Sequence, residues 1–398
     1  MDNSVEQIIG VLAVAMIVAI AARRFELPYT VGLVATGAVL ALSKANLGVP
    51  LTHDLIFHLI LPPLLFEAAL TLSARDLLRD APPILVLSCL GTVIAMGVVA
   101  CGMALALHWP APTALVFGAL IAATDPVSVI AMFKDQGLKG RLRVLVESES
   151  LFNDGVAAVL FVVALAWAQG DGEPVSLSTV GALARIVLGG VAVGIVCAGA
   201  AMLVAWRTSE HMIEAALTTV AAFGSFFLAE QLHVSGVLAT VGTGFLIGNF
   251  GPRQPDRKGF LSSRGREFIL LFWEFAAFLA DSVVFLLMGA AIASTTFESR
   301  ELAALPIAII LVLVARGLTV YPLSLMFSRS NWAIPLREQH VLWWGGLRGA
   351  LALALALSLP TSLPLREEVV VVTFGVVAFS VIVQGLTMPI VLKRLGFR

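Results

Sequence analysis

The segment at residues 149–154, Glu-Ser-Leu-Phe-Asn-Asp, places acidic and amide side chains inside an apolar run that extends from residue 144 to 168. A carboxylate near the middle of a bilayer costs roughly 2.5–3.5 kcal/mol on insertion scales. A chain that carries several such groups together therefore uses them, and the usual uses are ion pathways and proton relays.

The helical period divides this segment into two faces. Ser150 and Asp154 are four residues apart and share one face, whereas Glu149 and Asn153 share the neighbouring face. We expect Asp154 and Ser150 to line a cavity and Glu149 to face a cationic partner such as Arg316. Asn153 has a second interpretation, as a polar side chain that joins neighbouring helices.

Two further segments predict weak points in membrane helices. Thr124-Asp125-Pro126 contains a proline, which removes a backbone donor and displaces a carbonyl of the preceding turn. Oxygens released near Thr124 can face a cation, as in the broken helices of transporters. The glycine-rich segment 345–349, Gly-Gly-Leu-Arg-Gly, is the second weak point. Interrupted helices in corresponding positions of two halves indicate a transport site.

Five ionisable side chains from five predicted spans are expected at a similar depth. At 1.5 Å per helical residue, Asp154 lies roughly 16 Å from the cytoplasmic end of its span, near the centre of a ~30 Å hydrocarbon core. Paired charges around a water-accessible cavity would offset the cost of burial. The arginines are then counter-charges rather than ligands, and Glu67 has the alternative of reaching toward a helix end. The five are Glu67, Asp125, Asp154, Arg316 and Arg348.

The elements that position these groups must be membrane helices. The chain has 398 residues, of which 59% are hydrophobic and 13% charged, and its mean hydropathy is +0.98. Recurring apolar stretches of about 20 residues predict an all-α polytopic membrane protein, and the short alternating segments of a β-barrel are absent. The net charge of −1 argues against a nucleic-acid partner. The sequence contains neither a His-Glu-x-x-His zinc motif nor a Gly-x-Ser-x-Gly elbow.

The basic residues predict the orientation of the spans. Of the 25 Lys and Arg residues, 19 fall in one alternating set of loops and three in the other. The positive-inside rule then places the N-terminus outside and the C-terminus in the cytoplasm. Spans 5 and 12, which carry the weak points, would correspond if spans 1–6 and 8–13 are two inverted repeats with broken crossing helices. The thirteen spans are predicted at residues 6–23, 28–43, 55–72, 82–107, 111–133, 143–168, 177–206, 211–230, 232–250, 265–295, 302–327, 337–359 and 367–393.

The ordered motifs resemble those of the monovalent cation/proton antiporters, the NhaP-type sodium/proton antiporters and their animal relatives. The matching segments extend over nearly the whole chain. They are Phe66-Glu67, Thr124-Asp125-Pro126, and residues 149–154, 234–239 and 345–349.

This resemblance implies an ion and proton site that needs no cofactor. Asp154 would be its main carboxylate, and the Asn153-Asp154 pair implies electroneutral one-for-one exchange. The residues implied to bind the ion or proton are Asp154, Asp125, Ser150, Thr124 and Glu67, with Na⁺ held by Asp154, Ser150, Thr124 and Glu67. The residues implied to hold the site together are Asn153, Glu149, Arg316, Arg348 and Pro126. Whether Arg316 or Arg348 pairs with Glu149 stays open.

The resemblance also implies a homodimer in which a core domain moves like an elevator. The core would comprise mainly residues 82–168 and 302–393, with residues 55–72 at its edge. The dimerisation scaffold would comprise mainly residues 1–54 and 177–295, and no soluble domain is expected. The implied setting is a prokaryotic plasma membrane, with a monovalent cation, a proton and lipid as partners and with roles in sodium tolerance and pH homeostasis.

The predicted function is the antiport of Na⁺ or Li⁺ against H⁺. A carboxylate holds either a proton or a cation, and only the neutralised site would cross the hydrophobic barrier cheaply, so Asp154 would couple the two ions. The alternatives are a potassium/proton antiporter of the same fold, a sensor that has lost transport, and an intramembrane enzyme.

Overall fold

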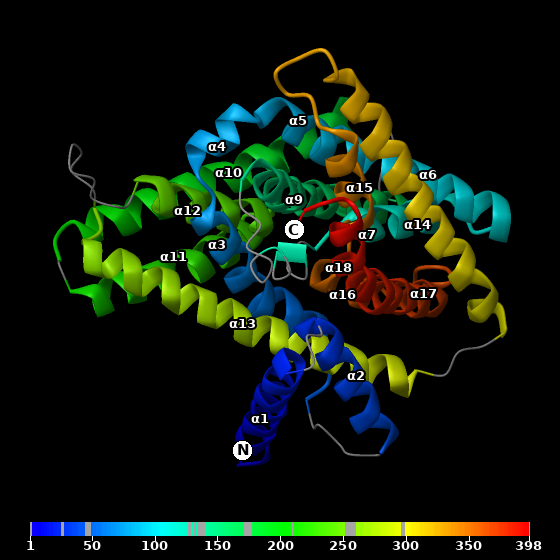
Figure 1. Ribbon diagram of the computed structural model, residues 1–398, viewed down its shortest axis with the longest axis horizontal. Helices are drawn as coiled ribbons and strands as arrows, with labels where there is room; N and C mark the ends of the chain where they lie inside the picture. The colour runs from blue at the N-terminus through cyan, green and yellow to red at the C-terminus, as the bar shows by residue number, and fades with distance from the viewer. Residues whose placement is uncertain are drawn as a thin grey trace. The chain divides into compact units, whose positions relative to one another are not determined.

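The computed structural model describes residues 2–24, 28–43, 49–125, 129–130, 133, 140–170, 177–208, 210–250, 260–295 and 299–397 (Figure 1). Every element of regular secondary structure in these ranges is a helix. In chain order the helices are α1 (Asp2–Arg24), α2 (Tyr29–Leu42), η1 (Leu55–Ile60), α3 (Leu61–Thr71), α4 (Ala74–Arg79), α5 (Ala81–Leu85), η2 (Val86–Leu90), α6 (Gly91–Leu107), α7 (Ala111–Ala122), α9 (Arg141–Ala168), α10 (Leu177–Ala205), α11 (His211–Gln231), α12 (Gly236–Phe250), α13 (Ser263–Ser294), α14 (Ser299–Met326), α15 (Leu336–Trp344), α16 (Ala350–Leu357), α17 (Arg366–Phe379), η3 (Ser380–Gln384) and α18 (Gly385–Arg394).

Many of these helices have the length and composition of membrane spans. Within the described ranges, seven continuous helical stretches are long and apolar enough to cross a bilayer, and five shorter apolar helices accompany them. This confirms the predicted all-helical polytopic membrane protein, whereas the count of thirteen spans stays a prediction. The seven stretches are Ala81–Leu107, Arg141–Ala168, Gly181–Ala205, His211–Gln231, Arg264–Ser294, Ser299–Met326 and Arg366–Arg394.

The contacts between residues divide the chain into two compact units. The first unit comprises Met1–Ile56, Asp80–Asp171 and Asp281–Arg398, and the second comprises Phe57–Arg79 and Gly172–Ala280. In the first unit α6 packs against α7 and α14, and α9 packs against α7. In the second unit α12 packs against α3, α10 and α11. The predicted division into a moving core and a dimerisation scaffold concerns motion and assembly, so it stays a prediction.

Helix α7 lies unusually close to α6. A Cβ atom on Gly118 of α7 would be 2.5 Å from the carbonyl oxygen of Met96 on α6, so only glycine permits this approach. Small residues allow membrane helices to pack backbone against backbone in this way. The close packing fixes the end of α7, where the polar segment Thr124-Asp125 follows.

Both predicted weak points coincide with helix ends. Helix α7 ends at Ala122, and residues 123–125 are not helical. A residue that precedes proline is disfavoured in the helical region, which accounts for the end of the helix near Asp125; Pro126 itself lies outside the described residues. Helix α15 ends at Trp344, residues 345–349 are not helical, and α16 begins at Ala350. The single predicted span 337–359 is therefore two short helices joined by the glycine-rich segment.

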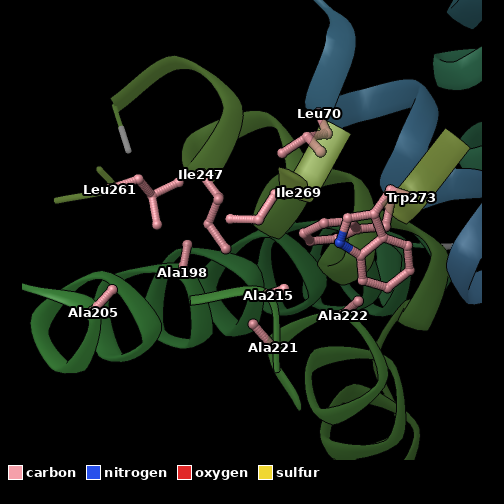
Figure 2. Close-up of a cluster of buried hydrophobic side chains, with 11 residues drawn as sticks. Leu70, Ala198, Ala205, Ala215, Ala221, Ala222, Ile247, Leu261, Ile269 and Trp273 are labelled. Atoms are coloured by element: carbon pink, nitrogen blue, oxygen red, sulfur yellow. The ribbon is translucent and has the colours of Figure 1, made fainter. Parts of the chain in front are cut away.

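The second unit has a buried apolar cluster that joins five of its helices, α3, α10, α11, α12 and α13 (Figure 2). Trp273 of α13 is its largest side chain, and the indole nitrogen donates a hydrogen bond to Thr218 Oγ1 of α11 at 2.9 Å. The ring of Phe66 of α3 lies 4.4 Å from that of Trp273 between centroids. The hydrogen bond to Thr218 satisfies the only polar atom of the Trp273 side chain, so this tryptophan is buried without an unsatisfied donor.

Candidate functional site

Glu149 and Arg316 form a buried, two-pronged ion pair between α9 and α14. The Nη1 and Nη2 atoms of Arg316 donate to the two carboxylate oxygens of Glu149 at 2.7 and 2.8 Å. Arg316 Nε donates to the carbonyl oxygen of Leu342 on α15 at 3.1 Å. Only 2% of Glu149 and 7% of Arg316 is exposed, so this pair is shielded from water. Of the two arginines considered as partners of Glu149, Arg316 makes the contact.

Arg348 binds the end of α7 instead. Its Nη1 atom donates to the carbonyl oxygens of Ala122 and Ala123 at 2.9 and 3.0 Å. The last carbonyls of a helix have no partner within the helix, and the helix dipole places partial negative charge there. A buried guanidinium at this position satisfies both needs. The Arg348 backbone amide in turn donates to Ser380 Oγ at 3.0 Å, which ties the glycine-rich segment to η3.

The two non-helical segments meet at Asp125. The backbone amide of Asp125 donates to the carbonyl oxygen of Leu347 at 2.7 Å. A Cβ atom on Gly349 would overlap the Asp125 carboxylate, so this carboxylate lies directly against the backbone of the second segment. The absence of a side chain at Gly349 therefore creates the space that Asp125 occupies.

Thr124, Ser150 and Asp154 bring oxygen atoms together between α7 and α9. Ser150 Oγ donates to the carbonyl oxygen of Thr124, and the two hydroxyl oxygens are 3.1 Å apart. The backbone of Thr124 also lies close to the carboxylate of Asp154. Asp154 Oδ1 is inaccessible to solvent and has no hydrogen-bond partner within the described part of the chain. Hydroxyl, carbonyl and carboxylate oxygens are the ligands that hard cations prefer.

Several charged side chains surround Asp154. Asp125 and Glu149 lie close enough to repel its negative charge, and Arg348 lies close enough to attract it. We call Thr124, Asp125, Glu149, Ser150, Asp154, Arg316 and Arg348 the site cluster; all seven belong to the first unit.

A small cavity opens beside the cluster. The space available to the centre of a water-sized sphere is about 10 Å³, which is room for a single water molecule or a dehydrated monovalent cation. Its walls include Thr124, Ser150, Glu149 and Arg316, together with Gly345 of the non-helical segment, whereas Asp154 does not line it. The arrangement can therefore accommodate one small particle next to several oxygen atoms.

Three of the predicted site residues lie outside the cluster. Asn153 is buried on α9, and its Oδ1 atom has no hydrogen-bond partner among the described residues. Glu67 is half-buried on α3, which belongs to the second unit, and Pro126 lies outside the described residues. Glu147, also on α9, forms an ion pair with Arg143 one turn away, with Nε and Oε2 3.5 Å apart.

Sequence reasoning missed the residues that support the cluster through the backbone. Ser380 carries no motif, and the carbonyl groups of Leu342 and Leu347 leave no trace in residue types. Of these supporting residues, only Gly349 was recognisable by its residue type, as a glycine of the segment 345–349 that was expected to interrupt a membrane helix. Its contribution depends on contact with Asp125, which is more than 200 positions away in the sequence.

Comparison with known proteins adds an independent line of evidence. Residues 11–394 match the family described as sodium/hydrogen exchanger, transmembrane. The chain is 39% identical to the low-affinity Na⁺/H⁺ antiporter NhaS1 of Synechocystis sp., with 98% of this chain and 75% of that protein covered. It is 34% identical to the Na⁺/H⁺ antiporter NhaH of Halobacillus aidingensis, with 98% and 97% covered. The sodium proton antiporter MjNhaP1 from Methanocaldococcus jannaschii has a similar fold, with a TM-score of 0.79 and 20% identity over 100% of this chain and 99% of that one.

Proposed function

Because this chain belongs to the sodium/hydrogen exchanger family, we propose that it exchanges Na⁺ or Li⁺ for H⁺ across a membrane, at a site centred on Asp154. The chain is a secondary transporter rather than an enzyme. The relatives named as Na⁺/H⁺ antiporters match it over nearly its full length, which supports Na⁺ as the cation. The cation and the proton are cargo, and no resident cofactor is needed.

The Oδ1 atom of Asp154, which has no hydrogen-bond partner among the described residues, carries this proposal. Buried polar atoms in folded proteins almost always have a hydrogen-bond partner, so each exception needs an explanation. Asp154 Oδ1 is such an exception, and it belongs to the carboxylate that lies beside the oxygens of Thr124 and Ser150. A bound proton or a bound cation would each complete this atom's interactions. Because both use the same oxygen atoms, the two cargoes exclude each other.

The charges of the site cluster support one-for-one exchange. Glu149 and Arg316 neutralise each other in their two-pronged pair. The cluster's other ionisable groups are Asp125, Asp154 and Arg348, whose formal charges sum to a single negative charge when all are ionised. One Na⁺ or one H⁺ would cancel that charge, and a neutral site crosses the hydrocarbon core at much lower cost than a charged one.

The helix ends support a moving site of the broken-helix type. Residues 123–125 and 345–349 leave the helical conformation at the place where the cluster forms, as expected where half-helices face an ion. We propose that these segments are the crossing breaks of spans 5 and 12 in a thirteen-span, inverted-repeat fold, and that a homodimer moves its core like an elevator. The N-terminus would lie outside and the C-terminus in the cytoplasm of a prokaryotic plasma membrane. We also propose Glu67 as a further ligand of the ion, as the resemblance to the family implies.

Proton movement in proteoliposomes tests this function. Purified protein is reconstituted with a pH-sensitive dye, an acid-inside gradient is imposed, and Na⁺, Li⁺ and K⁺ are added in turn. We expect Na⁺ and Li⁺ to dissipate the gradient, Asp154→Asn to abolish the response, and the exposed-site control Asp76→Asn on α4 to retain it. A folded Asp154→Asn protein that still moves protons in response to Na⁺ would remove Asp154 from the mechanism. A response to K⁺ alone would instead indicate potassium/proton antiport.

A further inference from the structure

A second cavity lies within the second unit, and none of its lining residues belongs to the site cluster. The space available to the centre of a water-sized sphere is about 150 Å³, and the cavity is open on one side. Its walls come from the last turns of α3 and α12 and the first turns of α13. Figure 2 shows four of its lining residues, Leu70, Ile247, Leu261 and Ile269, with the side chains of Ile247 and Ile269 directed toward each other.

The lining of this cavity is unsuitable for water. Apart from Arg266, its one side chain with a polar atom is Thr71, whose hydroxyl group already donates to the carbonyl oxygens of Glu67 and Ala68. An ordered water molecule needs two to four polar partners, and the side chains that line this open cavity offer few of them. A space of this size is therefore suited to a hydrocarbon group rather than to an ion or a chain of water molecules.

Arg266 gives the cavity a positively charged rim. The residue is exposed, and within the described residues its guanidinium group has no hydrogen-bond or ion-pair partner. Two further exposed arginines of the same unit, Arg264 on α13 and Arg75 on α4, belong to the loops that the positive-inside rule places in the cytoplasm. An apolar slot with an unpaired arginine at its rim matches a molecule with a hydrocarbon chain and an anionic head.

From this match we propose that the cavity binds an anionic phospholipid of the cytoplasmic leaflet. One acyl chain occupies the space between Leu70, Ile247 and Ile269, and the phosphate group contacts Arg266. Basic pockets between membrane helices on the cytoplasmic side are suited to anionic head groups, which juxtamembrane arginines attract electrostatically. This lipid site does not depend on ion exchange. A failure of the lipid proposal would therefore leave the function proposed for Asp154 unaffected, and the reverse also holds.

Native mass spectrometry of the full-length protein tests this proposal with two pairs of matched variants. Phosphatidylglycerol and phosphatidylcholine with identical acyl chains are titrated separately, and glycerol 3-phosphate serves as a head group without a chain. We expect one phosphatidylglycerol molecule to bind more tightly than phosphatidylcholine. Arg266→Gln should weaken the binding of phosphatidylglycerol about fivefold, because one arginine near a membrane surface contributes about 1 kcal/mol to the attraction of an anionic lipid. Arg264→Gln, on the same helix but outside the lining, should keep the difference between the two lipids.

The second pair of variants tests the acyl-chain position. Leu270→Trp should fill the cavity and remove tight binding, whereas Leu271→Trp, on an exposed neighbouring position, should leave it unchanged. Equal binding of the two lipids, equal losses in Arg266→Gln and Arg264→Gln, or equal binding of glycerol 3-phosphate would each overturn the proposal. Retained binding in a folded Leu270→Trp protein would do the same.

Discussion

Removing one partner of the Glu149–Arg316 pair should destabilise the protein far more than removing both. In Arg316→Gln, the carboxylate of Glu149 would remain buried without its two donors. Two charge-assisted hydrogen bonds of about 1.5–3 kcal/mol each are lost, which agrees with the roughly 3–5 kcal/mol observed when a buried ion pair loses one partner. The distances of 2.7 and 2.8 Å and the 2% exposure of Glu149 place this pair at the strong end of that range.

The double variant Glu149→Gln/Arg316→Gln separates the charge from the packing. Two neutral amides replace the two ions, and no uncompensated charge remains, although the glutamine side chain is two heavy atoms shorter than that of arginine. Breaking a buried pair is costly because one buried charge is left without a partner, and the double variant leaves no such charge, so we expect it to recover most of the stability that Arg316→Gln loses. The coupling energy from the resulting cycle should be about 2–4 kcal/mol, within the usual limits for residues in direct contact.

Unfolding in detergent provides the measurement. The wild-type protein, the two single variants and the double variant are compared under identical conditions, with Arg264→Gln as the matched control for an exposed arginine. The control should change stability by less than about 0.5 kcal/mol. If the double variant is no more stable than Arg316→Gln, the pair is not the source of the stabilisation and the reasoning from its geometry is wrong.

Two further substitutions test the site cluster itself. Gly349→Ala should reduce Na⁺/H⁺ exchange at least about tenfold, because the added Cβ atom would displace the carboxylate of Asp125. The control is Gly97→Ala on α6, where the added atom meets open space. Equal exchange by the two variants would contradict the contact between Gly349 and Asp125. Ser150→Ala removes a hydroxyl oxygen beside Thr124 that would coordinate Na⁺, so the KM for Na⁺ should rise about tenfold, which corresponds to a loss of about 1.4 kcal/mol. An unchanged KM in exchange assays at varied Na⁺ would remove Ser150 from the ligands.

The local geometry of the site could be predicted wherever one helix determines it. Helix α9 is continuous from Arg141 to Ala168, so the period of 3.6 residues alone separates Ser150 and Asp154 from Glu149 and Asn153. The polar segments near Thr124 and residues 345–349 were also recognisable, because proline and glycine change the backbone locally. These features depend on neighbours in the sequence and not on the rest of the fold.

Contacts between distant segments could not be predicted in the same way. Arg316 and Arg348 were equivalent in sequence as buried cations at similar depth, yet one binds a carboxylate and the other binds the carbonyl oxygens at the end of α7. The choice depends on which helix faces which, and a carbonyl group has no signature in residue type. Ser380 could not be predicted for the same reason, because its hydroxyl group supports the site only through the backbone amide of Arg348, which donates to it.

The two different uses of arginine bear directly on cation binding. An uncompensated guanidinium beside the cavity would repel Na⁺, but each arginine has an assigned negative partner. Arg316 is engaged through all three of its side-chain nitrogens, with Glu149 and with the Leu342 carbonyl, and Arg348 faces the negative end of a helix dipole. In the proposed mechanism, the cargo would therefore encounter the single net negative charge of Asp125, Asp154 and Arg348. If Arg316 is replaced while Glu149 remains, a second negative charge adds to the site, and one bound cation no longer neutralises it. A stability defect in that variant should then be accompanied by weaker coupling between Na⁺ and H⁺.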